Sequence, residues 1–451
     1  MIPRTSPPRD RRRPTFLLLA VVLSVVTLTW ILLGHGSAPS RLGAAGEHTD
    51  PGGDRHDEAV VPAPAATVAP RRPRAYLAWT PGGLPVGFRA RVRTIRGLEA
   101  TVVFAGDTLW LTGSRDVSGT AVDDPRPPYA FPIDAFAVDP DEVAPFLPSE
   151  VRREVVDTLA RGRAVLGTRS AVLRRLGVGG VLEFGEHEVR VGGVVPDRLI
   201  GWSEVLVSRD TGRRLGVALD RYLLALPEGR PSLPVFERML RPLVPSTQPM
   251  RVERPGGSPY MRVAGGVEPP VVLKEVFGEF AAALDAADPA YFRVDPAWDD
   301  HLVTRSVPLL GRLTCHRRFM ADLLVVMRTI ERDGLGSLIH STAGCFNART
   351  VGRSPSNPPS FHAYGAAVDI NAPENASGAA PMMDGRIVAI FEAAGFNWGG
   401  DFLIPDGMHF EYGGGPPRPR GRKTTGGNRT AANYVFRPML HIERPWEPRT
   451  T

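Results

Sequence analysis

Residues 360–371 read SFHAYGAAVDIN and place His362 seven positions before Asp369, with mostly small and apolar residues between them. Burying this polar pair without partners would cost several kcal/mol. A hydrogen bond, a salt bridge or a metal ion would satisfy the pair. The rest of the chain must therefore be searched for residues that complete one of these arrangements.

A second stretch, FNWGGDFLIPDGMHFEY at 396–412, supplies His409 and Asp406. Together with His362 and Asp369 it offers two imidazoles and one carboxylate, a zinc ligand set that leaves one tetrahedral position open for water. Asp406 stands three residues before His409, so the same turn can aim its carboxylate at that water. Catalytic zinc needs such a proton acceptor. An isolated histidine is more often an ordinary core or surface residue, but the conjunction of the two motifs predicts a Zn²⁺ site.

The segment from about 265 to 413 resembles the zinc peptidoglycan peptidases that include VanY-type D-alanyl-D-alanine carboxypeptidases and phage L-alanyl-D-glutamate endolysins. The motifs that carry the resemblance are VPLLG, AGCFNART, SFHAYGAAVDIN, FNWGGDF and DGMHFEY. It implies an enzyme, a zinc metallopeptidase whose metal ligands are His362, Asp369 and His409. The acid–base carboxylate would then be Asp406.

The same resemblance implies that Arg349 contacts the substrate near the scissile bond, where its guanidinium can hold a carboxylate or a developing oxyanion. A surface salt bridge is the alternative for this arginine. We also expect Ser360 and Trp398 to contact the substrate.

One departure bears on the substrate, which we expect to be a peptidoglycan stem peptide. VanY-type enzymes usually show Glu-Pro-Trp-His before the last ligand, whereas this chain has Asp406-Gly407-Met408-His409. This difference favours the endolysin-like branch. Cleavage of an internal L-Ala-D-Glu bond and cleavage of a terminal D-Ala-D-Ala bond both remain open.

The chain begins with a signal for membrane insertion. Residues 15–34, TFLLLAVVLSVVTLTWILLG, form an uncharged apolar run of 20 residues, long enough to cross a bilayer. Arginines at positions 9, 11, 12 and 13 precede it, so the N-terminus is expected in the cytoplasm and the rest outside the cell membrane. A cleaved signal peptide is the alternative, but its apolar core is usually shorter. We expect a single-pass signal-anchor.

Two further observations concern the exported part. The chain has two cysteines, Cys315 and Cys345, which can form a disulfide outside the cytoplasm; two buried free thiols are the alternative. The formal net charge is +6, with much of the excess near the chain ends. No aromatic-basic RNA motif or phosphate-binding loop is present, so we expect no nucleic-acid partner.

At 451 residues the chain is too long for one ordinary domain. We expect an α+β fold in a membrane-anchored multidomain chain, in which a zinc peptidase with a small antiparallel sheet flanked by helices follows a mixed α/β domain. The expected segments are a cytoplasmic basic tail (1–14), the transmembrane anchor (15–34), a disordered linker (35–75), the α/β domain (76–235), a second linker (236–260), the peptidase domain (261–415) and a basic tail (416–451).

The 76–235 region is expected to alternate strands and helices. RARVRTI and ATVVFAG suggest strands, VRREVVDTLARG has helical spacing, and a hairpin turns at Gly185-Glu186. The glycine- and valine-rich run through GEHEVRVGGVVPD resembles the extracytoplasmic domain of MacB- and FtsX-type ABC permeases. We expect a binding or positioning role, with an envelope protein as a candidate partner. The alternative functions for the whole chain are a catalytically idle cell-wall binding module and an envelope-complex component that acts through this domain.

Three helices are expected in the peptidase domain. VLKEVFGEFAAAL is the first, and CHRRFMADLLVVMRTIERDG is the second, ending at Gly334. DGRIVAIFEAAGF is the third, with Asp384 as its N-cap. SLIHSTAG is expected to be a strand.

Overall fold

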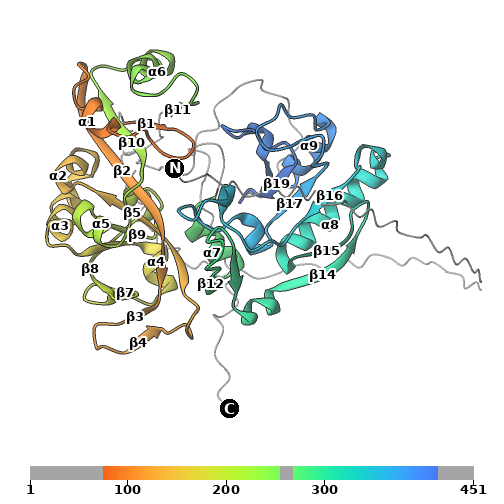
Figure 1. The fold of residues 1–451 in the computed structure, drawn as a ribbon, viewed down its shortest axis with the longest axis horizontal. Helices are drawn as coiled ribbons and strands as arrows, with labels where there is room; N and C mark the ends of the chain where they lie inside the picture. Colours follow the sequence, from red (N-terminus) through yellow and green to blue (C-terminus); the bar gives the residue numbers. More distant parts are fainter. Residues whose placement is uncertain (1–74, 254–267, 415–451) are drawn as a thin grey trace, which may run out of the picture. The chain divides into compact units, whose positions relative to one another are not determined.

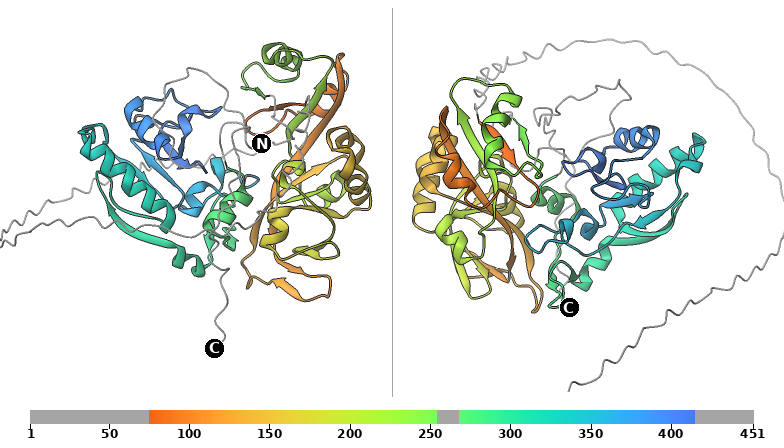
Figure 2. Two further views of the ribbon diagram at one scale, coloured as in Figure 1. Left: turned by 180° about the vertical axis from the view of Figure 1, so that it is seen from behind. Right: turned by 45° about the horizontal axis from the view of Figure 1, so that its top comes forward.

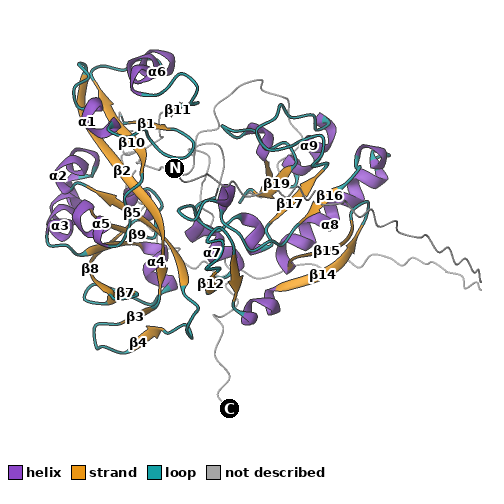
Figure 3. Cartoon of the chain, in the orientation of Figure 1, coloured by secondary structure: helices purple, strands orange, loops and turns teal. Residues whose placement is uncertain are grey.

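The computed structural model describes residues 75–253 and 268–414, which form a mixed α+β structure (Figure 3). The basic tails, the predicted anchor and nearly all of the 35–75 linker lie outside these residues. In the two described ranges, every helix is too short or too polar to cross a bilayer.

Residues 75–253 are built on an eleven-stranded sheet with the order β11-β1-β10-β2-β5-β9-β6-β8-β7-β3-β4. The pairs β5–β9 and β6–β8 are parallel and the other pairs are antiparallel. The strands are β1 (Tyr76–Trp79), β2 (Leu98–Leu111), β3 (Gly113–Arg115), β4 (Ala121–Asp123), β5 (Phe131–Val138), β6 (Ala164–Gly167), β7 (Val181–Phe184), β8 (His187–Val195), β9 (Val205–Ser208), β10 (Asp220–Pro227) and β11 (Arg251–Glu253).

Short helices join and cover these strands. They are α1 (Phe88–Val92), α2 (Pro140–Val143), α3 (Ser149–Ala160), α4 (Thr168–Leu173), α5 (Arg209–Arg214) and α6 (Leu233–Leu240), with 3₁₀ turns η1 (Ala144–Phe146), η2 (Asp197–Ile200) and η3 (Arg241–Leu243). Helices α2 and α3 lie side by side in Figure 1 and in both views of Figure 2. Val143, Val155 and Leu159 from these helices are buried in one cluster with Phe104 and Phe136 of the sheet.

The local predictions for this region have mixed outcomes. ATVVFAG lies in β2, most of VRREVVDTLARG lies in α3, and the Gly185-Glu186 hairpin is confirmed by the pairing of Phe184 with His187. The strand predicted for RARVRTI is wrong, because α1 occupies its first half. Phe88 and Val92 stand four residues apart and are both buried, which is the spacing of one helical face. Within the segment predicted as a second linker, the described residues include the end of α6, η3 and β11, which pairs with β1.

Residues 268–414 contain a four-stranded antiparallel sheet with the order β16-β17-β19-β18. Two separate hairpins, β12–β13 and β14–β15, accompany it. The strands are β12 (Ala282–Leu284), β13 (Phe292–Val294), β14 (Leu302–Val307), β15 (Gly311–His316), β16 (Thr342–Gly344), β17 (Ala367–Ile370), β18 (Phe396–Trp398) and β19 (His409–Tyr412). The helices are α7 (Pro270–Phe277), α8 (Arg317–Arg332) and α9 (Gly385–Ala393), with 3₁₀ turns η4 (Pro296–His301), η5 (Gly336–Leu338), η6 (Val351–Arg353), η7 (Phe361–Tyr364) and η8 (Gly399–Asp401).

Helices α8 and α9 pack against each other beside the small sheet (Figure 1). The predicted inner face of α8 is confirmed, since Phe319, Leu323, Val326, Met327 and Ile330 are all buried. Asp384 caps α9 by accepting a hydrogen bond from the backbone N–H of Arg386, as predicted. The predicted first helix is too long: α7 ends at Gly278, whose φ of 98° leaves the helical region, and the chain then enters β12. The predicted strand SLIHSTAG is shortened to β16 by the turn η5.

Candidate metal centre

The chain brings His362, Asp369 and His409 together through strand pairing and one tight turn. Asp369 in β17 and His409 in β19 are direct cross-strand partners, so their side chains lie on the same face of the small sheet. His362 lies in η7, which ends at Gly365 with φ 65°. A side chain at position 365 would place its Cβ only 2.5 Å from the backbone nitrogen of His316, so glycine is required there.

The three side chains form a nearly equilateral triangle of ligand atoms. His362 Nε2 lies 3.2 Å from Asp369 Oδ1 and 3.2 Å from His409 Nδ1, and His409 Nδ1 lies 3.0 Å from Asp369 Oδ1. Tetrahedral zinc with its usual bond lengths requires ligand atoms about 3.3 Å apart. All three residues are buried, and two nitrogens with one oxygen are a donor set that zinc accepts. The residues present therefore fit a zinc ion.

Hydrogen bonds on the far side of each imidazole select the nitrogen that faces this triangle. His362 Nδ1 lies 2.7 Å from the carbonyl oxygen of Cys345, an acceptor, so this nitrogen carries the proton and Nε2 keeps its lone pair. His409 Nε2 lies 3.0 Å from Glu411 Oε2, so in the same way the Nδ1 of His409 is left to face Asp369. Both rings are thus oriented as metal ligands are in proteins.

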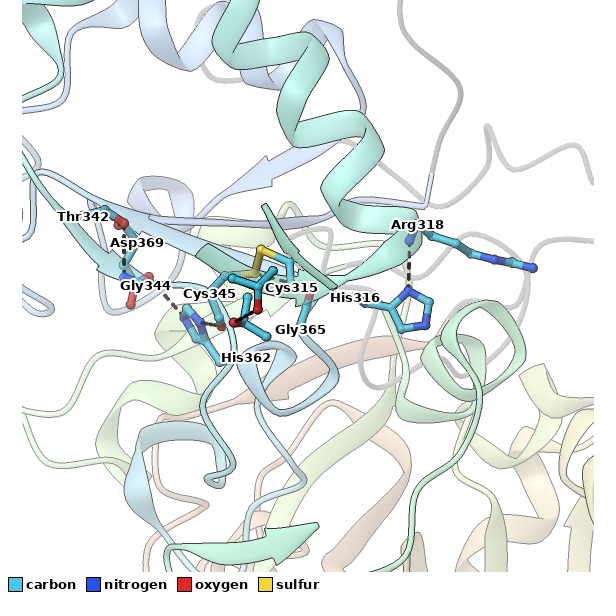
Figure 4. Close-up of a disulfide and its surroundings, with 11 residues drawn as sticks. Cys315, His316, Arg318, Thr342, Gly344, Cys345, His362, Gly365 and Asp369 are labelled. Atoms are coloured by element: carbon cyan, nitrogen blue, oxygen red, sulfur yellow. Dashed lines mark hydrogen bonds and ion pairs between the residues drawn. A yellow bond between two sulfur atoms is a disulfide. The ribbon is translucent and has the colours of Figure 1, made fainter. Parts of the chain in front are cut away.

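The carbonyl that orients His362 belongs to Cys345, which forms a disulfide. Cys315 in β15 and Cys345 after β16 are bonded through their sulfur atoms, with Cα atoms 5.5 Å apart (Figure 4). The close-up in Figure 4 shows the bridge beside His362, with the hydrogen bond from its ring to Cys345. The bridge therefore fixes a segment that contacts the candidate metal centre.

The charges of the triangle stabilise one another. Burial raises the pKa of Asp369, but the neighbouring imidazoles of His362 and His409 outweigh this effect and hold the pKa well below its ordinary value. Burial lowers the pKa of His409, but the hydrogen bonds to Asp369 and Glu411 outweigh that effect and raise the pKa to about 10.

Asp406 sits beside the triangle without joining it. Its backbone N–H donates to the Gly399 carbonyl at 2.8 Å, and its own carbonyl accepts from the His409 N–H at 3.0 Å, so one turn holds Asp406 and His409. Gly399 permits this approach, since a Cβ there would lie 2.5 Å from the Asp406 carbonyl oxygen. Asp406 Oδ1 is buried and has no hydrogen-bond partner among the described residues. Burial raises the pKa of this carboxyl group. Such a group is suited to receiving a proton.

The other predicted site residues lie close by, and two of them, Ser360 and Trp398, form hydrogen bonds with backbone groups. Arg349 is near enough for its charge to lower the pKa of Asp406. The Ser360 hydroxyl accepts a hydrogen bond from the His362 N–H at 3.3 Å and caps η7. The Trp398 indole N–H donates to the Gly407 carbonyl at 2.8 Å, inside the turn that carries Asp406. Substrate contacts by these three side chains remain predictions.

Glu411 is a site residue whose orienting role the sequence reasoning missed. It is buried, and it follows His409 by two positions in the same strand, so the two side chains share one face of β19. In the sequence, the signal for this role is the spacing of His409 and Glu411, which stand two residues apart in an expected strand.

Known proteins resemble this chain over part of its length. A search of curated proteins finds no match. Among solved structures, the chain is similar to the periplasmic region of MacB from Actinobacillus actinomycetemcomitans (11% identity, 40% of this chain and 88% of that one, TM-score 0.29). It is also similar to the extracellular domain of the noncanonic ABC-type transporter YknZ from Gram-positive bacteria (12%, 37% and 88%, TM-score 0.24) and to a domain of a permease-like protein from Porphyromonas gingivalis (13%, 42% and 94%, TM-score 0.27).

A family model described as D-alanyl-D-alanine carboxypeptidase matches residues 353–412. This range contains the three side chains of the triangle together with Asp406 and Glu411. The C-terminal part of the chain therefore carries a domain of the D-alanyl-D-alanine carboxypeptidase family, with a buried His-Asp-His triad that can hold a metal ion.

Proposed function

We propose that this protein is a zinc metallopeptidase that hydrolyses a peptide bond in the peptidoglycan stem peptide. The observation that carries the proposal is the triangle of His362, Asp369 and His409 with the buried, unpartnered carboxylate oxygen of Asp406 beside it. Zinc at the triangle would supply Lewis acidity, which polarises the substrate carbonyl and makes the attacking water more acidic.

Asp406 handles the proton in this proposal. Its free Oδ1 accepts a proton from the attacking water and then delivers it to the departing amine of the peptide. Burial raises the pKa of the Asp406 carboxyl group, which strengthens it as a base and brings its pKa closer to neutrality. Asp406 needs no metal bond for this role.

Arg349 supplies positive charge on the substrate side. Its guanidinium can pair with a carboxylate of the stem peptide or with the oxygen that becomes negative during hydrolysis. Its electrostatic effect on Asp406 supports a position within the same site.

We further propose that the enzyme works outside the cytoplasm, attached to the membrane through residues 15–34. The supporting observations are the apolar run with its preceding arginines and the Cys315–Cys345 disulfide, since disulfides persist in oxidising compartments.

The test is digestion of purified peptidoglycan and of a soluble stem pentapeptide by the zinc-loaded protein, followed by mass spectrometry of the products. Release of free D-alanine from the pentapeptide identifies a carboxypeptidase. New L-alanine carboxyl ends together with new D-glutamate amino ends identify an endopeptidase. Intact substrates with fully loaded protein would contradict the proposal and would favour an idle cell-wall binding module.

A further inference from the structure

Residues 350–359 form a loop whose two ends carry residues of the proposed peptidase site. Thr350 and Pro359 pair at its base, and the Ser360 N–H donates to the Arg349 carbonyl at 2.9 Å. Arg349 therefore stands at one end of the loop, and Ser360 leads into His362 at the other. A change in the position of the loop would move the proposed substrate-binding arginine.

An arginine from residues 75–253, here called the first domain, holds the tip of this loop; residues 268–414 are the second, peptidase domain. Arg221, in β10, donates from Nη1 to Asn357 Oδ1 at 2.9 Å and from Nη2 to the Ser356 carbonyl at 2.5 Å. Its Nε donates to the Gly106 carbonyl at 2.6 Å, which fixes the same guanidinium to β2. A planar guanidinium can make these three bonds at once with fixed directions, and a lysine ammonium cannot reproduce them.

The base of the loop is held separately, within the peptidase domain. The Thr350 N–H donates to the Ala290 carbonyl at 2.9 Å, and the Phe292 N–H donates to the Ala348 carbonyl at 3.3 Å. The tip and the base are thus anchored in different domains. Removing the contact at the tip should loosen the loop without dismantling its base.

A buried charge cluster also joins the two domains. Lys274 in α7 donates to both oxygens of Glu204, at 2.8 and 2.9 Å, and pairs with Glu279 at 2.6 Å. Arg174 in α4, fully buried, pairs with Glu279 at 2.5 Å. Glu204 and Arg174 belong to the first domain and Lys274 and Glu279 to the second. Buried charges tolerate little displacement, because each one depends on its partners.

We propose that Arg221 is a positioning residue of the peptidase: by holding the tip of the 350–359 loop, it fixes Arg349 and so makes the first domain part of the substrate-binding site. This inference rests on the proposed function. It gives the first domain a role within the enzyme that does not require a separate envelope partner.

The experiment compares Arg221→Gln, Arg221→Lys and Asn357→Ala in the full chain. Each variant should retain zinc and its thermal unfolding midpoint while kcat/KM on the stem peptide falls at least about tenfold, mainly through KM, because Arg349 is displaced. The double variant Arg221→Gln/Asn357→Ala should lose less than the product of the two single losses, because the two changes share the contact between Arg221 Nη1 and Asn357 Oδ1. The matched control is Arg213→Gln, an exposed arginine of the same domain that pairs only locally with Asp210 in the structure.

Hydrogen exchange of residues 349–362 provides a readout that does not depend on activity. Exchange should be faster in Arg221→Gln and Asn357→Ala than in Arg213→Gln. If the wild-type protein shows no cleavage, the proposed function fails and the role of Arg221 is judged on exchange alone. Unchanged exchange and unchanged KM in both Arg221→Gln and Asn357→Ala would overturn the inference. Losses of kcat/KM in these two single variants that multiply in the double variant would also overturn it.

Discussion

At the scale of single residues, hydrogen-bond acceptors behind His362 and His409 orient both imidazoles of the candidate metal centre. Glu411 accepts from His409 Nε2 and thereby leaves Nδ1 to face the triangle. Partners of this kind typically change metal affinity by about 10- to 100-fold when they are lost. The Glu411 carboxylate of β19 is therefore part of the candidate metal centre although it does not lie in the triangle.

Replacing Glu411 should test this dependence. Glu411→Met removes the acceptor, so zinc affinity should fall by about 10- to 100-fold, whereas Glu411→Gln keeps an acceptor oxygen and should lose less. Competition with a chelating dye measures both affinities. Glu374→Gln is the control, since this carboxylate is partly exposed and pairs with His340 instead. Wild-type affinity in the Glu411→Met variant would mean that this carboxylate does not orient His409.

The site residues that could be predicted from the sequence are those whose side-chain chemistry is needed for metal binding or proton transfer. His362, Asp369, His409 and Asp406 follow from their ligand chemistry and spacing, and the structure brings all four together. The acceptor behind His362 could not be predicted, because it is the backbone carbonyl of Cys345 and every residue has one. The role of Arg221 could not be predicted either, since its partners Ser356 and Asn357 lie far along the chain and carry no distinctive chemistry.

At the scale of elements, the disulfide ties β15 to the segment after β16, across a sequence separation of 30 residues. Both sulfur atoms belong to buried residues. The paired change Cys315→Ser/Cys345→Ser should therefore lower the free energy of unfolding by about 3–4 kcal/mol in the chain-entropy account. Denaturant unfolding of the metal-free protein measures the loss.

Reduction of the wild-type protein is the control for this prediction. The reduced wild-type protein should unfold at a denaturant concentration close to that of the paired variant, because both lack the cross-link. An unfolding free energy for the paired variant that equals that of the oxidised wild type would contradict a stabilising bridge.

Helices with a long apolar face were predictable, and short ones were not. Five apolar residues at helical spacing identify α8. Helix α1 has only Phe88 and Val92 to bury, and its alternating arginines match a strand equally well. Gly278 stops α7 within an otherwise helical pattern, which the spacing of apolar residues alone did not reveal.

At the scale of the whole molecule, the sequence indicated two folded regions but not the charges buried where they meet. Lys274 and Glu204 are 70 residues apart, and neither sequence environment marks the other as its partner. Lysine and glutamate are almost never buried unless paired, yet the apolar run around Lys274 predicts a core helix, not an ion pair.

Removing Lys274 should therefore destabilise the protein as a whole. Lys274→Met keeps the length of the side chain but leaves Glu204 and Glu279 with less positive charge, so the free energy of unfolding should fall by about 3–5 kcal/mol. Denaturant unfolding followed by probes in residues 75–253 and in residues 268–414 measures it. Arg213→Met, at an exposed position, should change stability by less than about 0.5 kcal/mol. A Lys274→Met variant as stable as the wild type would show that the cluster does not stabilise the fold.

The central claim is that zinc held by His362, Asp369 and His409 works with Asp406 to cut the stem peptide. The most direct test is the turnover of zinc-loaded Asp406→Asn against that of the zinc-loaded wild type on purified peptidoglycan. The variant should bind about one zinc per chain, because Asp406 is not a ligand. Its turnover should nevertheless fall by about 10²- to 10⁴-fold, the usual contribution of an acid–base group. Near-normal cleavage by zinc-loaded Asp406→Asn would contradict the account and would indicate Asp401 or Glu411 as the base.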